Sequence, residues 1–542
     1  MRHKLAARKV SGKKLQKLKD AFNKLMSPAV LNEDRKMIEK KPRKILSEMN
    51  FNNPDNYLMG DVDIAESQYE DWLRIDQRPK RTIPDMFRNK GWKSRVIYYA
   101  IDSSLALKGR RIIQKTLRIW EQKTCLKFVE NSQMDEGLLF VNERGCSSFI
   151  GHVGGVQTIN LLFPECTHVG VISHLLSHAL GAWHEQNRRD SSAFVTVHLD
   201  NITPDNYHAF LSFDDGTLDT EQLPYEYASI MHFDPMTPAM SLDSEAFTLT
   251  PIDETFMNVM GQRQSPSFLD YEKINAVYCA DACSSQPTLQ CLHNGYQNFS
   301  NCSECICPPG FGGTQCEGVE QTGARDCGGE LQATASPQYF TTPSYPNKFP
   351  RKQYCVWYIK AEREDQRVFL KFVETFDLPC QPNCRWSYVE VKVGEPFNRV
   401  GARFCCKRSP TASAPLASAD NEMVVIFRSD IEVADGFRAR YCMLATEANT
   451  HSWSAWSECT QKCGGCGRMM RQRTCQRPCE SMEVKKCNFN RCINSKFIIN
   501  NGEFFILING CCVGLAPGSD DTCQETNALK SLMGGLLGSN KR

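Results

Sequence analysis

Three histidines within one short stretch could together bind a metal ion. The stretch reads HLLSHALGAWHE and begins at His174. His174 and His178 are four residues apart, so both imidazoles leave the same face if this segment is a helix. Gly181 can adopt a positive φ and end that helix, after which the chain can turn back and bring His184 to the same point. Three neutral imidazoles with an open fourth position are what a catalytic Zn²⁺ site requires.

Each of these histidines could instead be an ordinary surface side chain or belong to a structural metal site. The chain contains only 11 histidines among 542 residues. Chance alone would produce three histidines at these spacings about 0.5% of the time. We therefore interpret the three as one zinc site.

The surrounding residues carry a family resemblance. The histidine stretch resembles the metzincin signature, and its continuation His184-Glu-Gln-Asn-Arg188 narrows the resemblance to the astacin family. Other motifs similar to that family follow in order between Thr82 and Cys279. They are Gly145–Ser148 with Gly154–Gln157 at the substrate-edge strand, Ser229–His232 at the Met-turn that contains Met231, Gly261–Arg263, and Ile274–Asn275 with Tyr278–Cys279. The resemblance implies an α+β metzincin domain with the activity of a zinc endopeptidase.

The resemblance also implies roles for residues outside the three histidines. It implies disulfide bonds that join Cys125 to Cys279 and Cys146 to Cys166, and it implies that Glu185 lies near the new N-terminus after the pro-region is removed. The motif Leu58-Met-Gly-Asp61 is similar to the pro-region motif whose aspartate occupies the open zinc position in the latent enzyme, although Leu58 replaces the usual phenylalanine. Asp61 is therefore the expected latency ligand; the alternative is an ordinary Gly-Asp turn.

Two residues depart from the family pattern at positions that carry catalysis. After the first histidine the family has glutamate, which takes a proton from the attacking water and passes it to the leaving amine; here the residue is Leu175. After the Met-turn histidine the family has tyrosine, and here Phe233 keeps the ring without the hydroxyl. A general base is typically worth about 10²–10⁴-fold in rate and one oxyanion donor about 10²–10³-fold.

These departures leave two hypotheses for the peptidase segment. In the first, the chain is an active extracellular-matrix endopeptidase with unusual chemistry. In the second, it keeps zinc and holds substrate without hydrolysing it, as a silent matrix adaptor or regulator. We predict a zinc-loaded domain whose hydrolysis is severely impaired, because neither Leu175 nor Phe233 can move or donate a proton.

Composition and charge exclude other functions. A net charge of +2 argues against a nucleic-acid-binding protein, and 27 cysteines indicate an oxidising compartment outside the cytosol. No apolar stretch is long enough to span a bilayer. Residues 1–25 are basic and lack the apolar core of a signal peptide. Either the first exon is missing from this sequence or the protein stays inside the cell. The cysteines favour the first, so we expect secretion.

The cysteines also divide the chain into segments. The first 81 residues lack cysteine, are basic, and end in Arg78-Pro-Lys-Arg81, which indicates a pro-region removed by a proprotein convertase. Leucines and a phenylalanine at a helical period predict a short amphipathic helix near Leu15 and Leu18. The expected order is pro-region 1–81, peptidase domain 82–280, EGF-like module 281–318, CUB β-sandwich 327–443, thrombospondin type 1 repeat 451–493, and an unassigned tail 494–542. The odd cysteine total leaves at least one thiol unpaired or bonded to another chain.

Sequence motifs support the three trailing modules. Six closely spaced cysteines from Cys283 to Cys316 resemble an EGF-like module, and six cysteines permit 15 pairings. Alternating strands between Cys327 and Cys442 resemble a CUB domain, whose acidic residues sometimes bind Ca²⁺. Trp453-Ser-Ala-Trp456 and Arg471-Gln-Arg473 resemble a thrombospondin repeat, in which tryptophans and arginines stack. The calcium ligands available here are Glu374, Asp377, Asp430 and Asp435, but the expected Tyr-Asp step is absent near Tyr388, so calcium binding is the less favoured outcome.

The whole domain order resembles secreted nematode astacins that are associated with cuticle collagen processing and moulting. Extracellular matrix or cuticle proteins are therefore the expected partners. Sequons at Asn201, Asn298 and Asn301 are consistent with a secreted glycoprotein.

Overall fold

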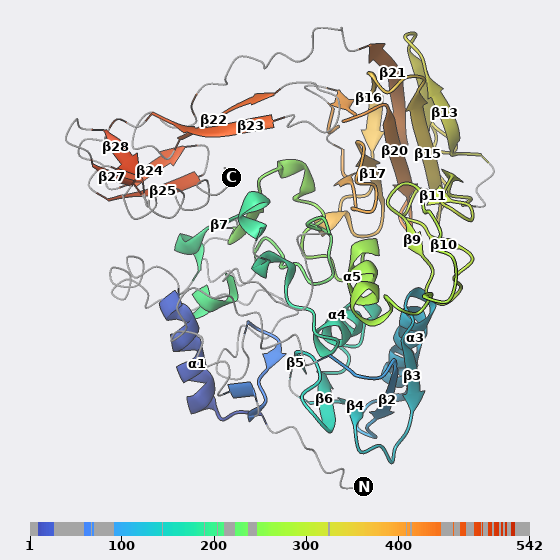
Figure 1. Ribbon diagram of the computed structural model, residues 1–542. Helices are drawn as coiled ribbons and strands as arrows, with labels where there is room; N and C mark the ends of the chain where they lie inside the picture. Colours follow the sequence, from blue (N-terminus) through green and yellow to red (C-terminus); the bar gives the residue numbers. More distant parts are fainter. Residues whose placement is uncertain are drawn as a thin grey trace, which may run out of the picture. The chain divides into compact units, whose positions relative to one another are not determined.

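The computed structural model forms two compact units, Met1–Leu444 and Ala445–Arg542 (Figure 1). In the first unit the structure describes residues 9–25, 59–66, 68–69, 91–143, 145–188, 190–202, 204–210, 223–236, 247–322, 326–407, 409–411 and 415–444. From there on it describes residues 445, 459, 467–472, 482–488, 490, 497–500, 503–508, 511–512, 515–517 and 522–525. The expected convertase site at Arg78–Arg81 lies outside the described residues.

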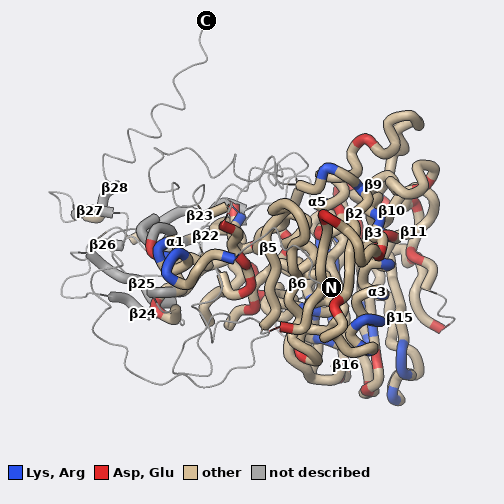
Figure 2. The backbone as a smooth tube through the Cα atoms, turned by 90° about the horizontal axis from the view of Figure 1, so that it is seen from below, with Lys and Arg blue, Asp and Glu red and all other residues tan. Residues whose placement is uncertain are grey.

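Two pieces of the expected pro-region belong to the first unit. Helix α1 (Gly12–Leu25) forms where the apolar spacing predicts it, and it buries Leu15 and Leu18 against the 3₁₀ helix η7 (Pro204–Phe210). Lysines recur along the rest of this helix (Figure 2). The second piece contains strand β1 (Val62–Asp63). A backbone hydrogen bond of 3.0 Å from Val10 to Ile64 joins the two pieces.

A six-stranded sheet supports the histidine segment. Its order is β1-β5-β6-β4-β2-β3, and all neighbouring pairs are parallel except β5 with β6. The remaining strands are β2 (Val96–Ile101), β3 (Lys127–Glu130), β4 (Gly137–Val141), β5 (Cys146–Phe149) and β6 (Val156–Leu161). Because β1 belongs to the expected pro-region, removal of that region would make β5 the edge strand.

Two helices pack together beside this sheet. α3 (Leu107–Lys123) contacts α4 (Val169–Ala179), and α4 also contacts β5 and β6. The indole of Trp120 is fully buried between them and donates a 3.2 Å hydrogen bond to Ser173 Oγ. α4 is buried along almost its whole length, so its side chains are held in fixed positions.

The second half of the peptidase segment consists mainly of short elements. They are η4 (Glu185–Asn187), η5 (Ser191–Ala193), β7 (Val195–Val197), η6 (Leu199–Asn201), β8 (Leu249–Pro251), η9 (Glu254–Phe256) and α5 (Phe268–Tyr278). α5 begins with a capping box in which Ser267 and Asp270 satisfy each other's backbone N–H groups. The structure contains both disulfides that the resemblance implied, Cys125–Cys279 and Cys146–Cys166.

The six-cysteine segment is a small module of two hairpins. Its cysteines pair first with third, second with fourth and fifth with sixth, as Cys283–Cys302, Cys291–Cys305 and Cys307–Cys316. The hairpins are β9 (Tyr296–Gln297) with β10 (Cys305–Ile306), and β11 (Phe311–Gly312) with β12 (Gly318–Val319). Phe311 packs against the following sandwich, where it lies in one apolar cluster with Tyr358 and Phe397.

The segment from Cys327 is a two-sheet β-sandwich. One sheet has the order β13-β15-β20-β17-β18 and the other β14-β21-β16-β19. Alternate residues of β16 point into the core, as predicted from its sequence. The elements are β13 (Gly329–Ala333), β14 (Gln338–Thr341), β15 (Tyr354–Ala361), β16 (Gln366–Asp377), η10 (Pro382–Cys384), β17 (Tyr388–Lys392), β18 (Ala402–Phe404), β19 (Leu416–Ala417), β20 (Glu422–Arg428) and β21 (Gly436–Ala445).

Three disulfides close the sandwich and one thiol is left over. The bonds are Cys327–Cys355, Cys380–Cys406 and Cys384–Cys405. Among the described cysteines, Cys442 is the free one, which agrees with the odd total.

The second unit contains short paired strands. They are β22 (Gly467–Gln472), β23 (Met482–Cys487), β24 (Phe497–Asn500), β25 (Glu503–Ile508), β26 (Cys511–Cys512), β27 (Leu515–Pro517) and β28 (Cys523–Glu525). The tryptophans expected to stack in the thrombospondin repeat, Trp453 and Trp456, lie outside the described residues, as does Arg473. Across the described part of the chain, no helix combines the length and the apolar character needed to cross a bilayer.

Candidate metal centre

The three histidines converge on one point from a helix and the loop that follows it. His174 and His178 extend from the same face of α4, which ends at Ala179. Gly181 has φ 102°, a conformation that side chains with a Cβ rarely adopt, and it turns the chain so that His184 approaches the helix. The ring centroids lie 4.7 Å apart for His174–His178, 4.8 Å for His178–His184 and 5.5 Å for His174–His184.

Backbone carbonyl groups orient two of the imidazole rings. Nδ1 of His174 lies 2.8 Å from the carbonyl oxygen of Ile230, and Nδ1 of His178 lies 2.9 Å from that of Ala182. A carbonyl oxygen can only accept, so each Nδ1 carries the proton and each Nε2 presents its lone pair to the centre. This is the tautomer that a metal ligand needs.

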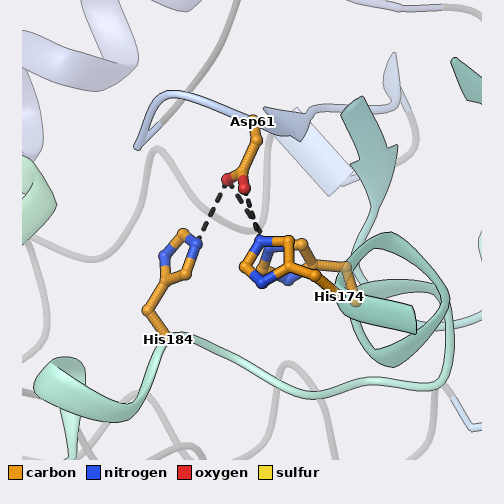
Figure 3. Close-up of side chains that lie close together, drawn as sticks. Asp61, His174 and His184 are labelled. Atoms are coloured by element: carbon orange, nitrogen blue, oxygen red, sulfur yellow. Dashed lines mark hydrogen bonds and ion pairs between the residues drawn. The ribbon is translucent and has the colours of Figure 1, made fainter. Parts of the chain in front are cut away.

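Asp61 of the pro-region closes the fourth side of the cluster (Figure 3). Its Oδ2 lies 2.6 Å from Nε2 of His174, and its Oδ1 lies 3.2 Å from Nε2 of His184 and 3.5 Å from Nε2 of His178. One ligand atom from each of the four residues lies within 4.8 Å of the others, and all four residues are buried. Among the described residues this is the one group of three or more His, Cys, Asp or Glu side chains with such geometry.

The protonation states of the cluster suit a cation. Burial lowers the pKa of His174 to about 3 and that of His184 to about 4, although the Asp61 charge opposes both changes. Burial alone would raise the pKa of Asp61, but the three histidines outweigh it and hold that pKa well below its ordinary value. Neutral imidazoles and an ionised carboxylate are the donor set of a Zn²⁺ site. The buried Nε2 atoms of His178 and His184 face the Asp61 carboxylate at 3.5 and 3.2 Å, and a bound metal would accept their lone pairs.

The two departures from the family pattern lie inside apolar clusters. Leu175 is fully buried in the core shared by α3, α4 and the sheet. Phe233 is also fully buried, with its ring centroid 4.6 Å from that of His184 and 5.7 Å from that of Phe210. Asp61 is the only carboxylate in the described histidine cluster, and it lies in the expected pro-region. The peptidase segment itself therefore contributes no carboxylate to the cluster.

Hydrogen bonds of the Met-turn, Ser229–His232, fix the backbone next to the histidine cluster. The carbonyl oxygen of Met231 accepts a 3.0 Å hydrogen bond from Glu185 N, which fixes the chain next to His184. Asp270, at the start of α5, accepts hydrogen bonds from Ser229 Oγ (2.5 Å) and Ile230 N (2.8 Å). Sequence reasoning missed Asp270, although the capping-box pattern from Ser267 to Asp270 was a usable signal.

Glu185 is held by internal cations in this structure. Its carboxylate pairs with Lys273 and, at 3.2 Å, with Arg188, and it accepts a 3.0 Å hydrogen bond from Glu226 N. Burial alone would raise the pKa of Glu185, but Lys273 and then Arg188 outweigh it and lower the pKa. The new N-terminus expected as its partner, Thr82, lies outside the described residues, and sequence reasoning did not identify Lys273.

Two family models match the chain: the Astacin peptidase family over residues 85–279 and the CUB domain over residues 327–441. The zinc metalloproteinase nas-38 of Caenorhabditis elegans is 31% identical, and the match covers 90% of this chain and 87% of that protein. The chain belongs to the astacin family. The zinc metalloproteinase dpy-31 of the same organism is 35% identical to this astacin over 83% of this chain and 77% of its own length.

The solved structure of a zinc-protease also matches. High choriolytic enzyme 1, a hatching enzyme zinc-protease of Oryzias latipes, is 31% identical and covers 36% of this chain and 98% of its own, with a TM-score of 0.33. The predicted astacin and CUB domains are thus confirmed by the family models, and zinc is the metal of the matching metalloproteinases. The EGF-like module and the thrombospondin repeat stay predictions.

The other predicted sites of this astacin lie apart from the metal centre. Glu374 forms a 2.7 Å ion pair with Arg438 and accepts a hydrogen bond from Tyr345, and the four acidic residues proposed for Ca²⁺ do not form a ligand cluster among the described residues. Of the sequons, Asn201 donates a 2.7 Å hydrogen bond to Phe247 O, Asn298 donates one of 3.1 Å to Glu304, and Asn301 is exposed.

Proposed function

We propose that this astacin is a latent extracellular protein whose processed form binds one Zn²⁺ through His174, His178 and His184 and hydrolyses peptide bonds poorly. The observation that carries the proposal is the presence of Leu175 directly after the first histidine, fully buried among apolar side chains. The absent general base corresponds to a rate loss of about 10²–10⁴-fold.

The roles of the chain's own residues follow from their positions. When bound, Zn²⁺ would supply Lewis-acid activation of a carbonyl group or of water. The three histidines hold the metal, and the carbonyl groups of Ile230 and Ala182 keep two of their rings oriented. Leu175 can neither take a proton from water nor return one to a leaving amine. Phe233 excludes water beside His184 but donates no hydrogen bond to a developing oxyanion.

Latency follows from the contact between Asp61 and the histidines. With a carboxylate at the fourth position, neither water nor a substrate carbonyl group can reach the metal. We propose that a proprotein convertase cuts after Arg81, that Asp61 then leaves with the pro-region, and that β5 becomes available to extended peptides. The disulfides favour processing in an oxidising, extracellular compartment.

A second candidate function is a non-hydrolytic matrix adaptor. The packing of Leu175 and Phe233 favours it, because both side chains complete apolar clusters and leave no unpaired polar group where the family has two proton-active residues. Such a protein would keep zinc and bind matrix or cuticle proteins through strand β5 and its trailing modules. These partners follow from the resemblance of the domain order to secreted nematode astacins.

Restoring the two residues tests whether hydrolysis by the natural chain is impaired. Three purified, convertase-processed proteins would be compared. They are the natural chain, the double variant Leu175→Glu, Phe233→Tyr, and the double variant Leu175→Gln, Phe233→Tyr, which is the non-ionisable control. We expect measurable cleavage of a casein or fluorogenic peptide only in the Glu/Tyr variant, abolished by a chelator. Equal, chelator-sensitive rates in the natural and the Glu/Tyr proteins would show that the natural chain has another general base, and the proposal would be wrong.

A further inference from the structure

A second carboxylate of the pro-region is bound away from the histidines. Ser147 on β5 and Asn160 on β6 face each other directly across the two strands, and both are fully buried. Asn160 Nδ2 donates a 2.7 Å hydrogen bond to Ser147 Oγ, and Ser147 Oγ donates one of 2.8 Å to Oδ2 of Asp63. Asn160 Nδ2 also lies 3.3 Å from the same Asp63 oxygen. Two neutral donors therefore converge on one carboxylate oxygen.

This arrangement fixes the chemistry of the pair. The opposite orientation of the Asn160 amide would place its carbonyl oxygen against the Asp63 carboxylate, acceptor against acceptor. The Ser147 hydroxyl accepts from Asn160, so its one proton is directed to Asp63. The pair thus presents donors only, which suits an anionic or acceptor side chain and not a cationic one.

The position of the pair connects it to peptide binding. Asp63 follows Asp61 by two residues on a segment that runs parallel to β5, and Ser148 N donates a 3.0 Å hydrogen bond to Asp61 O. Any extended peptide that replaced this segment, with a metal-binding group in place of Asp61, would bring its next-but-one side chain to Ser147 and Asn160.

The charges around Asp63 differ between the two states of the protein. Lys9 lies 3.0 Å from Oδ1 of Asp63, but Lys9 belongs to the pro-region and leaves with it. Asp63 is buried, and Glu143, a negative charge that acts on it, stays with the peptidase domain. After processing, the two donors of Ser147 and Asn160 are therefore what remains to hold a carboxylate, against a weak opposing charge.

We propose that Ser147 and Asn160 form a carboxylate-binding subsite, filled by Asp63 in the latent protein and by an acidic side chain of a bound peptide after processing. This inference rests on the proposed function in one respect, namely that β5 accepts extended peptides after processing. Ser147 and Asn160 are not among the residues of the metal cluster. The inference assigns to them a class of ligand, namely an acidic side chain two residues away from the group that faces the metal.

Binding of a labelled pro-region peptide tests the first half of the proposal. The probe is a fluorescent peptide of residues 57–69, titrated into the processed, zinc-loaded chain and followed by anisotropy. We expect the Asp63→Asn peptide to bind about tenfold more weakly, since hydrogen bonds to a charged acceptor are the stronger ones. Ser147→Ala in the protein should remove most of this difference between the Asp and Asn peptides.

Ser148→Ala is the matched control. Ser148 is the next residue of β5 and is equally buried, but its hydroxyl donates to the neighbouring Phe149 O. This variant should keep the full difference between the two peptides, and its melting temperature reports on folding. Equal affinity of the two peptides for the natural protein, or an equal loss for both peptides in Ser147→Ala, would overturn the subsite.

A second set of probes tests the ligand class outside the pro-region. Peptides of the form mercaptoacetyl-Val-Xaa-Ile-Ala place a thiol at the metal and vary the residue that corresponds to Asp63. We expect Asp to bind tightest and Lys weakest, and equal binding of Asp, Asn, Ala and Lys would contradict the proposal. Two controls report on the zinc site separately: a pro-region peptide with Asp61→Asn, and metal analysis of the protein. A failure of the metal site therefore cannot be mistaken for a failure of this subsite.

Discussion

Oδ2 of Asp61 lies 2.6 Å from Nε2 of His174, although the two residues are 113 positions apart in the chain. The contact joins the pro-region to the centre of the peptidase domain. Strand β1 and helix α1 hold the pro-region on either side of this point, because β1 pairs with β5 and α1 packs against η7. In the proposed latent state, packing and strand pairing would therefore act together with one carboxylate.

Removing the Asp61 carboxylate should open the metal centre without removing the pro-region. In the zinc-loaded, unprocessed chain, Asp61→Ala should bind a hydroxamate at least about tenfold more tightly than the natural protein, because the carboxylate no longer competes for the fourth position. Titration calorimetry measures this. Glu66→Ala is the control, since Glu66 pairs with Lys14 at the surface. Unchanged hydroxamate affinity in Asp61→Ala would argue against a latency role.

Loss of the Lys273 cation should destabilise the peptidase domain. Lys273→Met leaves the buried Glu185 carboxylate short of one counter-charge, and breaking one side of a buried ion pair costs about 3–5 kcal/mol. The partner Arg188 reduces that loss without abolishing it. Lys360→Met, which breaks a more exposed pair with Glu422, should cost no more than about 1 kcal/mol. Urea unfolding measures both, and a cost of no more than about 1 kcal/mol for Lys273→Met would show that Lys273 is not structurally important.

The junction between the peptidase and CUB domains should weaken as the pH rises. Glu226 Oε2 accepts a 3.0 Å hydrogen bond from Val400 N of the CUB domain, and burial raises the pKa of Glu226 to about 7. A carboxyl group whose pKa is raised by folding stabilises the fold fully below its unfolded pKa of about 4.5 and loses that contribution as the pH rises through about 7. The loss amounts to about 3 kcal/mol for this group.

Thermal unfolding between pH 5 and pH 8 checks this expectation. Glu226→Gln should flatten the decline in melting temperature, while Glu317→Gln, at an exposed position, should leave it unchanged. A second carboxyl at the same junction, Glu272, bonds Asn398 and also has a pKa raised by burial to about 7, so the double Gln variant should be flatter still. An identical pH profile for Glu226→Gln and the natural chain would contradict the assignment.

Local patterns carried most of what the sequence could predict about the metal centre. The spacing of His174 and His178 determines a shared helix face, and Gly181 determines the turn that brings in His184. The junction of Glu226 with Val400 could not be predicted, because the two residues are far apart in sequence and meet only after two domains have folded. The same applies to Lys273 beside Glu185, and to Asp63 beside Ser147.

Other outcomes show where single-residue reasoning is weak. Calcium binding is the less favoured expectation, and the ion pair that Glu374 forms with Arg438 on a neighbouring strand could not be predicted. That pairing depends on strand register in the sandwich, which the order of residues does not reveal. By contrast, the odd total of 27 cysteines predicts at least one unpaired thiol without indicating which one, and Cys442 is the free cysteine among the described residues.

Zinc content and peptidase rate, determined on the same sample of the natural processed chain, test the central claim most directly. We expect about one Zn²⁺ per chain, lost in His178→Ala, together with a cleavage rate at least about 10²-fold below that of the Leu175→Glu, Phe233→Tyr variant measured in parallel. A processed chain without zinc, or one with zinc that cleaves peptides as fast as that variant, would contradict the account.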